Sequence, residues 1–229
     1  MGKVIQINKL VKFTLPCDIP EEKRNEKNNI VCFICKNGDV LYNNKINGVQ
    51  VEFYGMNNTI IIYEGTKFNK CKIKCGNNMN ILIMESSKMI LNLNIMAKMS
   101  RGGNVFIGKN FQCFGVTLKM QSDKSIFIGS DCMMSGGIFI WNTDGHAILD
   151  ENLKCINKDE DVIIGRKVWI GHNVEILKGV HIQHDSVVGS RALVTNKFIE
   201  SNVVIAGIPA KIVRHNITWS SMFPSFYEG

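Results

Sequence analysis

From Ile164 to Ile199 the sequence reads IGRKVW, IGHNVE, ILKGVH, IQHDSV, VGSRAL and VTNKFI, in consecutive blocks of six residues. Every block begins with isoleucine or valine, its fifth residue is mostly small or β-branched, and glycine recurs at its second position. A helix repeats about every 3.6 residues and a strand every second residue, so neither element alone produces this period. Short strands joined by tight corners do produce it, because their aliphatic side chains stack inward from coil to coil. The pattern predicts an all-β hexapeptide-repeat solenoid.

A looser version of the repeat precedes this stretch. The equivalent isoleucines Ile62, Ile83, Ile107 and Ile128 are 21, 24 and 21 residues apart, so each coil is predicted to hold three hexapeptides and a small bulge. Asparagine, glycine and aspartate lie at the expected corners, where they tolerate left-handed backbone conformations. The repeat therefore extends well before Ile164.

The register divides the chain. We expect an N-terminal extension over residues 1–45, a solenoid domain over 46–215 and a C-terminal tail over 216–229. An exposed last coil needs a cap, which the aromatic tail or an N-terminal segment could provide.

One excursion interrupts the solenoid pattern. Between Ile140 and Ile164 the aliphatic slots would fall on His146, Asn152 and Lys158, which do not belong in an apolar stack. Residues 145–161 are therefore predicted to leave the solenoid as a loop. Long loops inside compact domains are often functional.

Composition indicates a folded protein without a membrane anchor. Of 229 residues, 45% are hydrophobic and only 4 are proline, and no apolar run near the start is long enough for a signal peptide or a membrane span. The 8 cysteines include the close pairs Cys32/Cys35 and Cys71/Cys75, which have no neighbouring histidine, so free thiols are expected rather than a metal site. The formal charge of +7 is spread without a basic run, which argues against a nucleic-acid partner. We expect a cytoplasmic protein.

Three short motifs carry a family resemblance. They are Trp141-Asn-Thr-Asp-Gly-His146, Val168-Trp169-Ile-Gly171 and Ala206-Gly-Ile-Pro-Ala-Lys211. Together with the coils, from about residue 50 to 217, they resemble the left-handed β-helix (hexapeptide-repeat) acyltransferases, most closely the bacterial capsule and lipopolysaccharide sugar O-acetyltransferases. The resemblance implies a left-handed parallel β-helix, a homotrimer with acetyl-CoA between neighbouring solenoids, and acetyl transfer to a hydroxyl of a surface-polysaccharide sugar.

Acetyl transfer to an alcohol needs a base, an oxyanion donor and substrates held in line. His146 lies at the mouth of the predicted loop, and the resemblance places it at the catalytic histidine position, as the base of a direct transfer. Asp144 is assigned to acceptor binding, and either Asp144 or Asp150 could orient the ring. Asp144 can equally be a turn residue. A backbone amide near Gly171 is expected to bind the oxyanion.

The resemblance also assigns the co-substrate. Trp169 would contact the acceptor or the pantetheine arm, although a packing role at a corner fits as well. Small residues would line the pantetheine channel, and cations would meet the phosphates. The positions for acetyl-CoA are Trp169, Ser190, Thr195, Lys211 and Arg214. Relatives often have lysine after the threonine, where this chain has Asn196.

Three other functions remain open. The scaffold could N-acetylate an amino-sugar nucleotide, which relaxes the need for a strong base. It could be a metal-dependent hydratase, although His172, His181 and His184 lack the expected spacing. A structural solenoid without catalysis is the third alternative.

Overall fold

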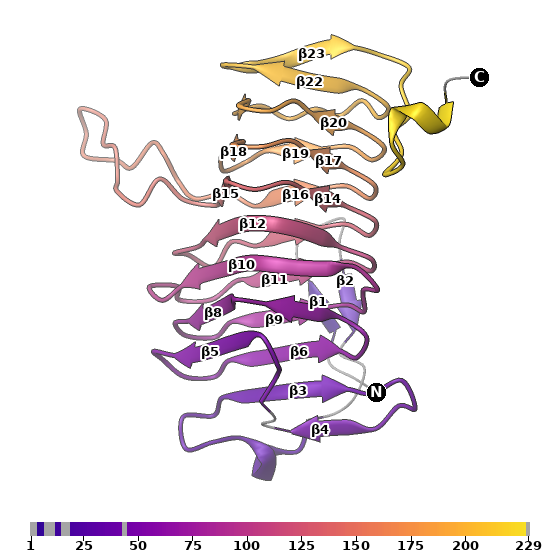
Figure 1. Cartoon of the computed structure of the whole chain (residues 1–229). Helices are drawn as coiled ribbons and strands as arrows, with labels where there is room; N and C mark the ends of the chain where they lie inside the picture. Colours follow the sequence, from indigo (N-terminus) through magenta and orange to yellow (C-terminus); the bar gives the residue numbers. More distant parts are fainter. Residues whose placement is uncertain (1–3, 7–11, 15–18, 43–44, 228–229) are drawn as a thin grey trace.

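The computed structural model describes residues 4–6, 12–14, 19–42 and 45–227 (Figure 1). The described chain is almost entirely β-structure, stacked as parallel coils in a solenoid with three faces. In Figure 1, the front strands β10 (Met89–Ala97) and β12 (Gln112–Lys119) run from right to left. The strands behind them belong to the sheet of β3 (Ile30–Ile34) and β6 (Thr59–Tyr63), which run from left to right. Because the chain rises as it turns in this direction, the winding is left-handed. The predicted fold class is confirmed.

The first face is a parallel sheet that continues from β3 and β6 along the solenoid. Its further strands are β9 (Asn80–Ile83), β11 (Asn104–Ile107), β13 (Ile126–Ile128), β16 (Val162–Ile164) and β19 (His181–Ile182). The pairings join Ile62 with Ile83, Ile83 with Ile107 and Ile107 with Ile128, which are the intervals expected from the sequence.

The second and third faces share long strands at the N-terminal end. β10 and β12 bend from one face to the other at Asn92 and Gly115, both with positive φ. The second face adds β7 (Lys67–Asn69), β14 (Met133–Met134), β17 (Trp169–Ile170), β20 (Val187–Val188) and β22 (Val204–Gly207). The third face adds β5 (Val49–Phe53), β8 (Cys71–Cys75), β15 (Ile138–Trp141), β18 (Glu175–Ile176) and β21 (Leu193–Val194).

Two edges of the prism matter for the site. The loop edge joins the third face to the first, through residues 76–79, 98–103, 120–125, 142–161, 177–180 and 195–198. The tail edge joins the first face to the second, through residues 108–111, 129–132, 165–168 and 183–186.

The sixfold pattern maps directly onto the core. The position-one side chains, from Ile164 to Val194, are 0% exposed, and each lies beside its equivalent in the next coil. The recurrent glycines are explained by coil-to-coil contact. A Cβ at Gly171 would lie 2.7 Å from the Ser190 amide nitrogen, and one at Gly165 would lie 2.7 Å from that of His184. Position two must therefore be glycine where the coils stack this closely.

The solenoid begins earlier and ends differently from the sequence prediction. β3 already pairs in parallel with β6, ahead of the predicted boundary at residue 46. Its five residues form a single apolar rung, which needs no sixfold repeat. At the other end, β22 folds back on β23 (Ala210–Arg214) as an antiparallel hairpin and covers the last coil. The aromatic tail, one of the two candidate caps, instead lies against the side of the coils (Figure 1), so at this end the β22–β23 hairpin is the cap.

The remaining described elements are short. β4 (Val40–Tyr42) pairs antiparallel with β3, and β1 (Val4–Gln6) pairs antiparallel with β2 (Lys12–Thr14). The 3-10 turns span Glu21–Lys23 and Pro224–Tyr227. No helix among the described residues has the length and hydrophobicity needed to cross a membrane.

Candidate active site

Between β15 and β16 the chain leaves the loop edge as a projecting hairpin (Figure 1). Leu149 and Cys155 form its antiparallel bridge, and the Asp150 carboxylate accepts hydrogen bonds from the amides of Asn152 and Lys154, each at 2.9 Å. At the base, the Asp161 carboxylate accepts from the Ser125 amide at 2.7 Å. Asp150 therefore shapes the hairpin turn.

His146 lies on the outgoing strand of this hairpin and is exposed. Its carbonyl accepts a hydrogen bond from Asn157 Nδ2 at 2.9 Å, and Asn157 Nδ2 also donates to Asp144 at 2.8 Å. Within the described residues, the His146 ring itself makes no hydrogen bond or ion pair. The backbone at His146 is thus fixed, while its imidazole remains exposed.

Asp144 anchors the hairpin to the coil above. Its carboxylate pairs with the Lys178 ammonium, which also donates to the Asn157 carbonyl at 2.7 Å. The hydrogen bond from Lys178, and then that from Asn157, hold the pKa of Asp144 below its ordinary value, against the opposing effect of partial burial. In this structure neither Asp144 nor Asp150 contacts the His146 ring. Lys178 and Asn157 are members of the site that the sequence did not single out.

Removing the ion pair between Lys178 and Asp144 should loosen the segment that carries His146. The Lys178→Met variant is expected to lower kcat about 10-fold, because a misplaced catalytic group loses the benefit of orientation. KM for acetyl-CoA and the thermal midpoint should change little. Because the folded-state pKa of Asp144 is depressed, the pair is intact at neutral pH and is lost as the pH falls through that lowered pKa. Hydrogen exchange over residues 145–160, compared with the parent protein, measures the loosening; unchanged exchange with unchanged kcat would contradict it.

A groove of about 960 Å³ lies between the tail and the second face. Trp219 fixes the tail there, because its Nε1 donates to the Lys167 carbonyl at 2.8 Å and its ring lies 6.2 Å from that of Trp169. Trp169 is 36% exposed and lines the groove together with the polar side chains of Asn110, Gln112 and Asp131. The groove therefore combines aromatic surface with hydrogen-bonding groups, a combination that suits a sugar or a pantetheine arm.

The remaining predicted positions fall in three places. Thr195 ends the third face at the loop edge, above the exit of the hairpin. Ser190 lies at the edge between the second and third faces, and its hydroxyl accepts from the His172 amide at 3.1 Å. Lys211 and Arg214 are exposed on β23 at the end of the solenoid. In the part of the chain that the structure describes, none of these four side chains forms a hydrogen bond or an ion pair with His146.

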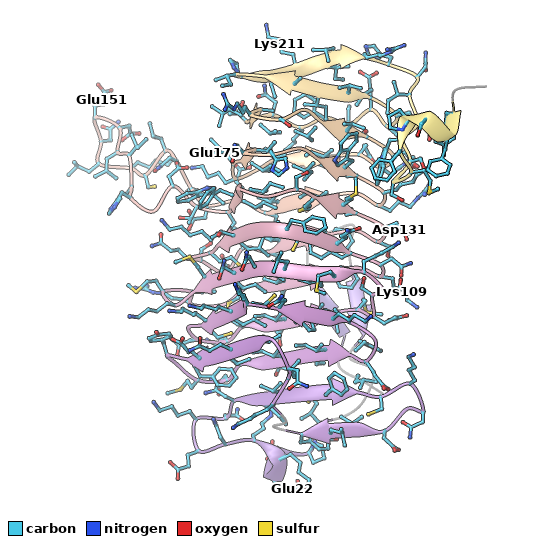
Figure 2. The ribbon with its side chains drawn as sticks, viewed as in Figure 1. Glu22, Lys109, Asp131, Glu151, Glu175 and Lys211 are labelled. Carbon is cyan, nitrogen blue, oxygen red and sulfur yellow. The ribbon has the colours of Figure 1, made fainter. Side chains whose placement is uncertain are left out.

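Figure 2 shows the hairpin and a residue of the tail groove on opposite sides of the molecule. Glu151, in the hairpin, projects on one side of the molecule, whereas Asp131, which lines the tail groove, lies on the opposite edge. His146 and Trp169 therefore belong to different edges of the same solenoid.

The amides proposed for the oxyanion are engaged. The Gly171 amide donates to the Val188 carbonyl at 2.9 Å, and the His172 amide donates to Ser190. Both donors are thus already engaged, one by the backbone of the next coil and the other by the Ser190 hydroxyl.

The three histidines considered for a metal-dependent hydratase each contact different groups. His172 Nδ1 accepts from the Gly136 amide at 3.2 Å, and His184 Nδ1 lies 2.7 Å from an Asp185 carboxylate oxygen. His181 is half-buried on the first face, where burial and then Lys197 lower its pKa. Among the described residues, no group of three or more His, Cys, Asp or Glu side chains is placed to hold a metal ion.

Comparison with known proteins decides the family. The bacterial transferase hexapeptide (six repeats) family matches residues 161–196. The polysialic acid O-acetyltransferase of Neisseria meningitidis is 38% identical over 190 residues, which cover 72% of this chain and 86% of that protein. The chain belongs to the hexapeptide-repeat sugar O-acetyltransferases. The predicted family and O-acetyltransferase activity are thereby confirmed.

Two further similarities agree with this assignment. The polysialic acid O-acetyltransferase of Escherichia coli O1:K1 / APEC is 38% identical over 123 residues, which cover 53% of this chain but only 39% of that protein. The crystal structure of the polySia-specific acetyltransferase NeuO superposes on this acetyltransferase with a TM-score of 0.74 and 31% identity, covering 86% of each chain. The likeness therefore extends beyond the matched repeats to most of the solenoid.

Proposed function

We propose that this enzyme transfers the acetyl group of acetyl-CoA to a hydroxyl of a sialic acid polymer on a bacterial surface, with His146 as the general base. The observation that carries the proposal is an exposed, backbone-anchored imidazole on the projecting hairpin of a chain that is similar over most of its length to polysialic acid O-acetyltransferases. His146 takes the hydroxyl proton as the oxygen attacks the thioester carbonyl. On collapse of the tetrahedral intermediate the carbon–sulfur bond breaks, CoA leaves as the thiol with the proton returned by His146, and the ester remains on the sugar.

We further propose a homotrimer in which each active site forms between two subunits. His146 and Thr195 lie at the loop edge, whereas Trp169 and Ser190 lie on the second face and at its far edge. In this cyclic assembly the loop edge of one copy meets the second face of the next, so that His146 lies beside Trp169 of the neighbouring copy. Acetyl-CoA would lie along this contact, with Lys211 and Arg214 meeting its phosphates.

The free thiols agree with the proposed location. Cys71, Cys75, Cys113 and Cys132 are buried and form no disulfide with one another, as expected for a protein that folds in the reducing cytoplasm.

An acceptor panel tests the proposal. The enzyme and acetyl-CoA are incubated with a sialic acid polymer, a neutral polysaccharide and an amino-sugar nucleotide, and CoA release is followed. We expect turnover with the sialic acid polymer, at least about 10-fold faster than with the neutral polysaccharide, because the chain carries net positive charge and the polymer is anionic. The product should be an ester, whose acetyl group mild alkali removes. An alkali-stable amide on the amino sugar would instead support the N-acetyltransferase alternative.

A further inference from the structure

A cationic surface covers the N-terminal half of the third face, below the hairpin that carries His146. It contains Lys72 and Lys74 on β8, Lys119 on β12 and Lys98 and Arg101 in the loop-edge turn after β10, and we call these five residues the lysine strip. The strand pairing aligns Lys74, Met96, Lys119 and Trp141 on successive rungs. Because neighbouring rungs are about 4.8 Å apart, the strip follows the solenoid axis toward the hairpin exit.

Most of this charge is not neutralised. Lys74 is 3.5 Å from Glu52, whose second partner is the Tyr54 hydroxyl at 2.6 Å. In the described part of the chain, Lys72 and Arg101 make no ion pair. Lys98 lies over the Tyr54 ring at 4.4 Å, and Lys119 over the Trp141 ring at 4.3 Å. A cation held on an aromatic face is positioned without losing its charge.

Beside the strip is a hollow of about 610 Å³ at the edge between the second and third faces. Two ammonium groups and three side-chain amides line it, from Lys70, Lys72, Gln50, Asn92 and Asn94. Ammonium groups bind carboxylates, and primary amides both donate to and accept from hydroxyl and acetamido groups. The lining therefore fits a carboxylated sugar better than a neutral one.

We propose that the lysine strip and this hollow form a secondary binding site for the acceptor, which holds a run of carboxylated sugars while another part of the same chain reaches His146. This inference rests on the proposed function, because it takes the acceptor to be a polymer. A nucleic acid fits less well, since the Tyr54 and Trp141 rings are covered by lysines and cannot stack with bases.

The test compares acceptor lengths in two matched variants of the full chain. The strip variant is Lys72→Ala/Lys98→Ala/Arg101→Ala. The control is Lys27→Ala/Lys36→Ala/Lys45→Ala, which removes the same charge from exposed positions outside the strip and outside the second face. For the strip variant at low salt, KM for a long sialic acid polymer should rise about 10-fold, because three exposed ionic contacts are lost. Its kcat, its KM for sialic acid dimer and both KM values of the control should stay within about 2-fold. Raising the salt concentration should narrow the difference between strip variant and parent.

Each result has one meaning. An unchanged polymer KM, or an equal rise for the dimer or for the control, overturns the secondary site. If the parent protein acetylates neither the polymer nor the dimer, the proposed function is wrong. The secondary site is then tested only by the affinity of the protein for the polymer. For that arm, calorimetry measures polymer binding to the His146→Ala protein with and without the strip substitutions. Equal affinities, or tighter binding to duplex DNA than to the polymer, also overturn the secondary site.

Discussion

Replacing His146 with alanine is expected to lower kcat for acetyl transfer by at least about 100-fold, because a positioned general base is worth about 10²–10⁴ in rate. The side chain is exposed and, within the described residues, its ring bonds to no other group, so the fold does not depend on it. Exposed substitutions of this kind change stability by about 0.5 kcal/mol or less. The thermal midpoint and the affinity for acetyl-CoA should therefore remain close to those of the parent protein.

The matched control is His215→Ala, which removes another exposed histidine. His215 Nδ1 lies 3.1 Å from Glu200, near the end of the solenoid, well away from the hairpin. This control should keep kcat within about 2-fold, as expected for a surface change outside the site. Steady-state release of CoA gives kcat, and calorimetry gives acetyl-CoA binding. If His146→Ala kept more than about half of the parent kcat, general-base catalysis by this residue would be excluded.

The sixfold pattern made most of the core predictable. Because each coil repeats the same path, one aliphatic residue in six must face inward, and Ile170, Ile176 and Ile182 are all 0% exposed. The same arithmetic places Lys178 above Asn142, since Ile140 pairs with Ile176. The periodicity thus contained a hint of the hairpin anchor, although the sequence alone does not say that the Asp144 side chain turns toward Lys178.

Contacts outside the sixfold repeat could not be predicted from the sequence. Trp219 meets the Lys167 carbonyl across 52 residues, and the tail has no period that would predict where it lies. β3 forms one apolar rung, which a single strand can produce without any repeat. The lysine strip was hidden for a different reason: its members are spread along the sequence, and only the stacking of coils gathers them on one face. The amino-acid composition therefore gives the net positive charge of the chain, but not the face on which the charged side chains gather.

Mixing two impaired variants should restore activity if the site is shared between subunits. Trp169→Ala is expected to lower kcat/KM at least about 10-fold, because it removes the exposed ring that faces the tail groove. In a cyclic trimer each site takes His146 from one copy and Trp169 from the next. When His146→Ala and Trp169→Ala chains are coexpressed in equal amounts, about a quarter of the sites combine an intact histidine with an intact tryptophan, and activity should recover to about a quarter of the parent value.

A second mixture separates this arrangement from a site held within one chain. Coexpressing the parent chain with the His146→Ala/Trp169→Ala double variant should also leave about a quarter of the sites intact if the residues come from neighbouring copies. If both residues served the same site from one chain, this mixture would retain about half of the activity and the first mixture would recover none. Equal recovery in the two mixtures therefore indicates a shared site. A shared site agrees with the layout of the single solenoid, where the hairpin leaves one edge (Figure 1) and the groove that Trp169 lines lies beside another edge, next to the tail.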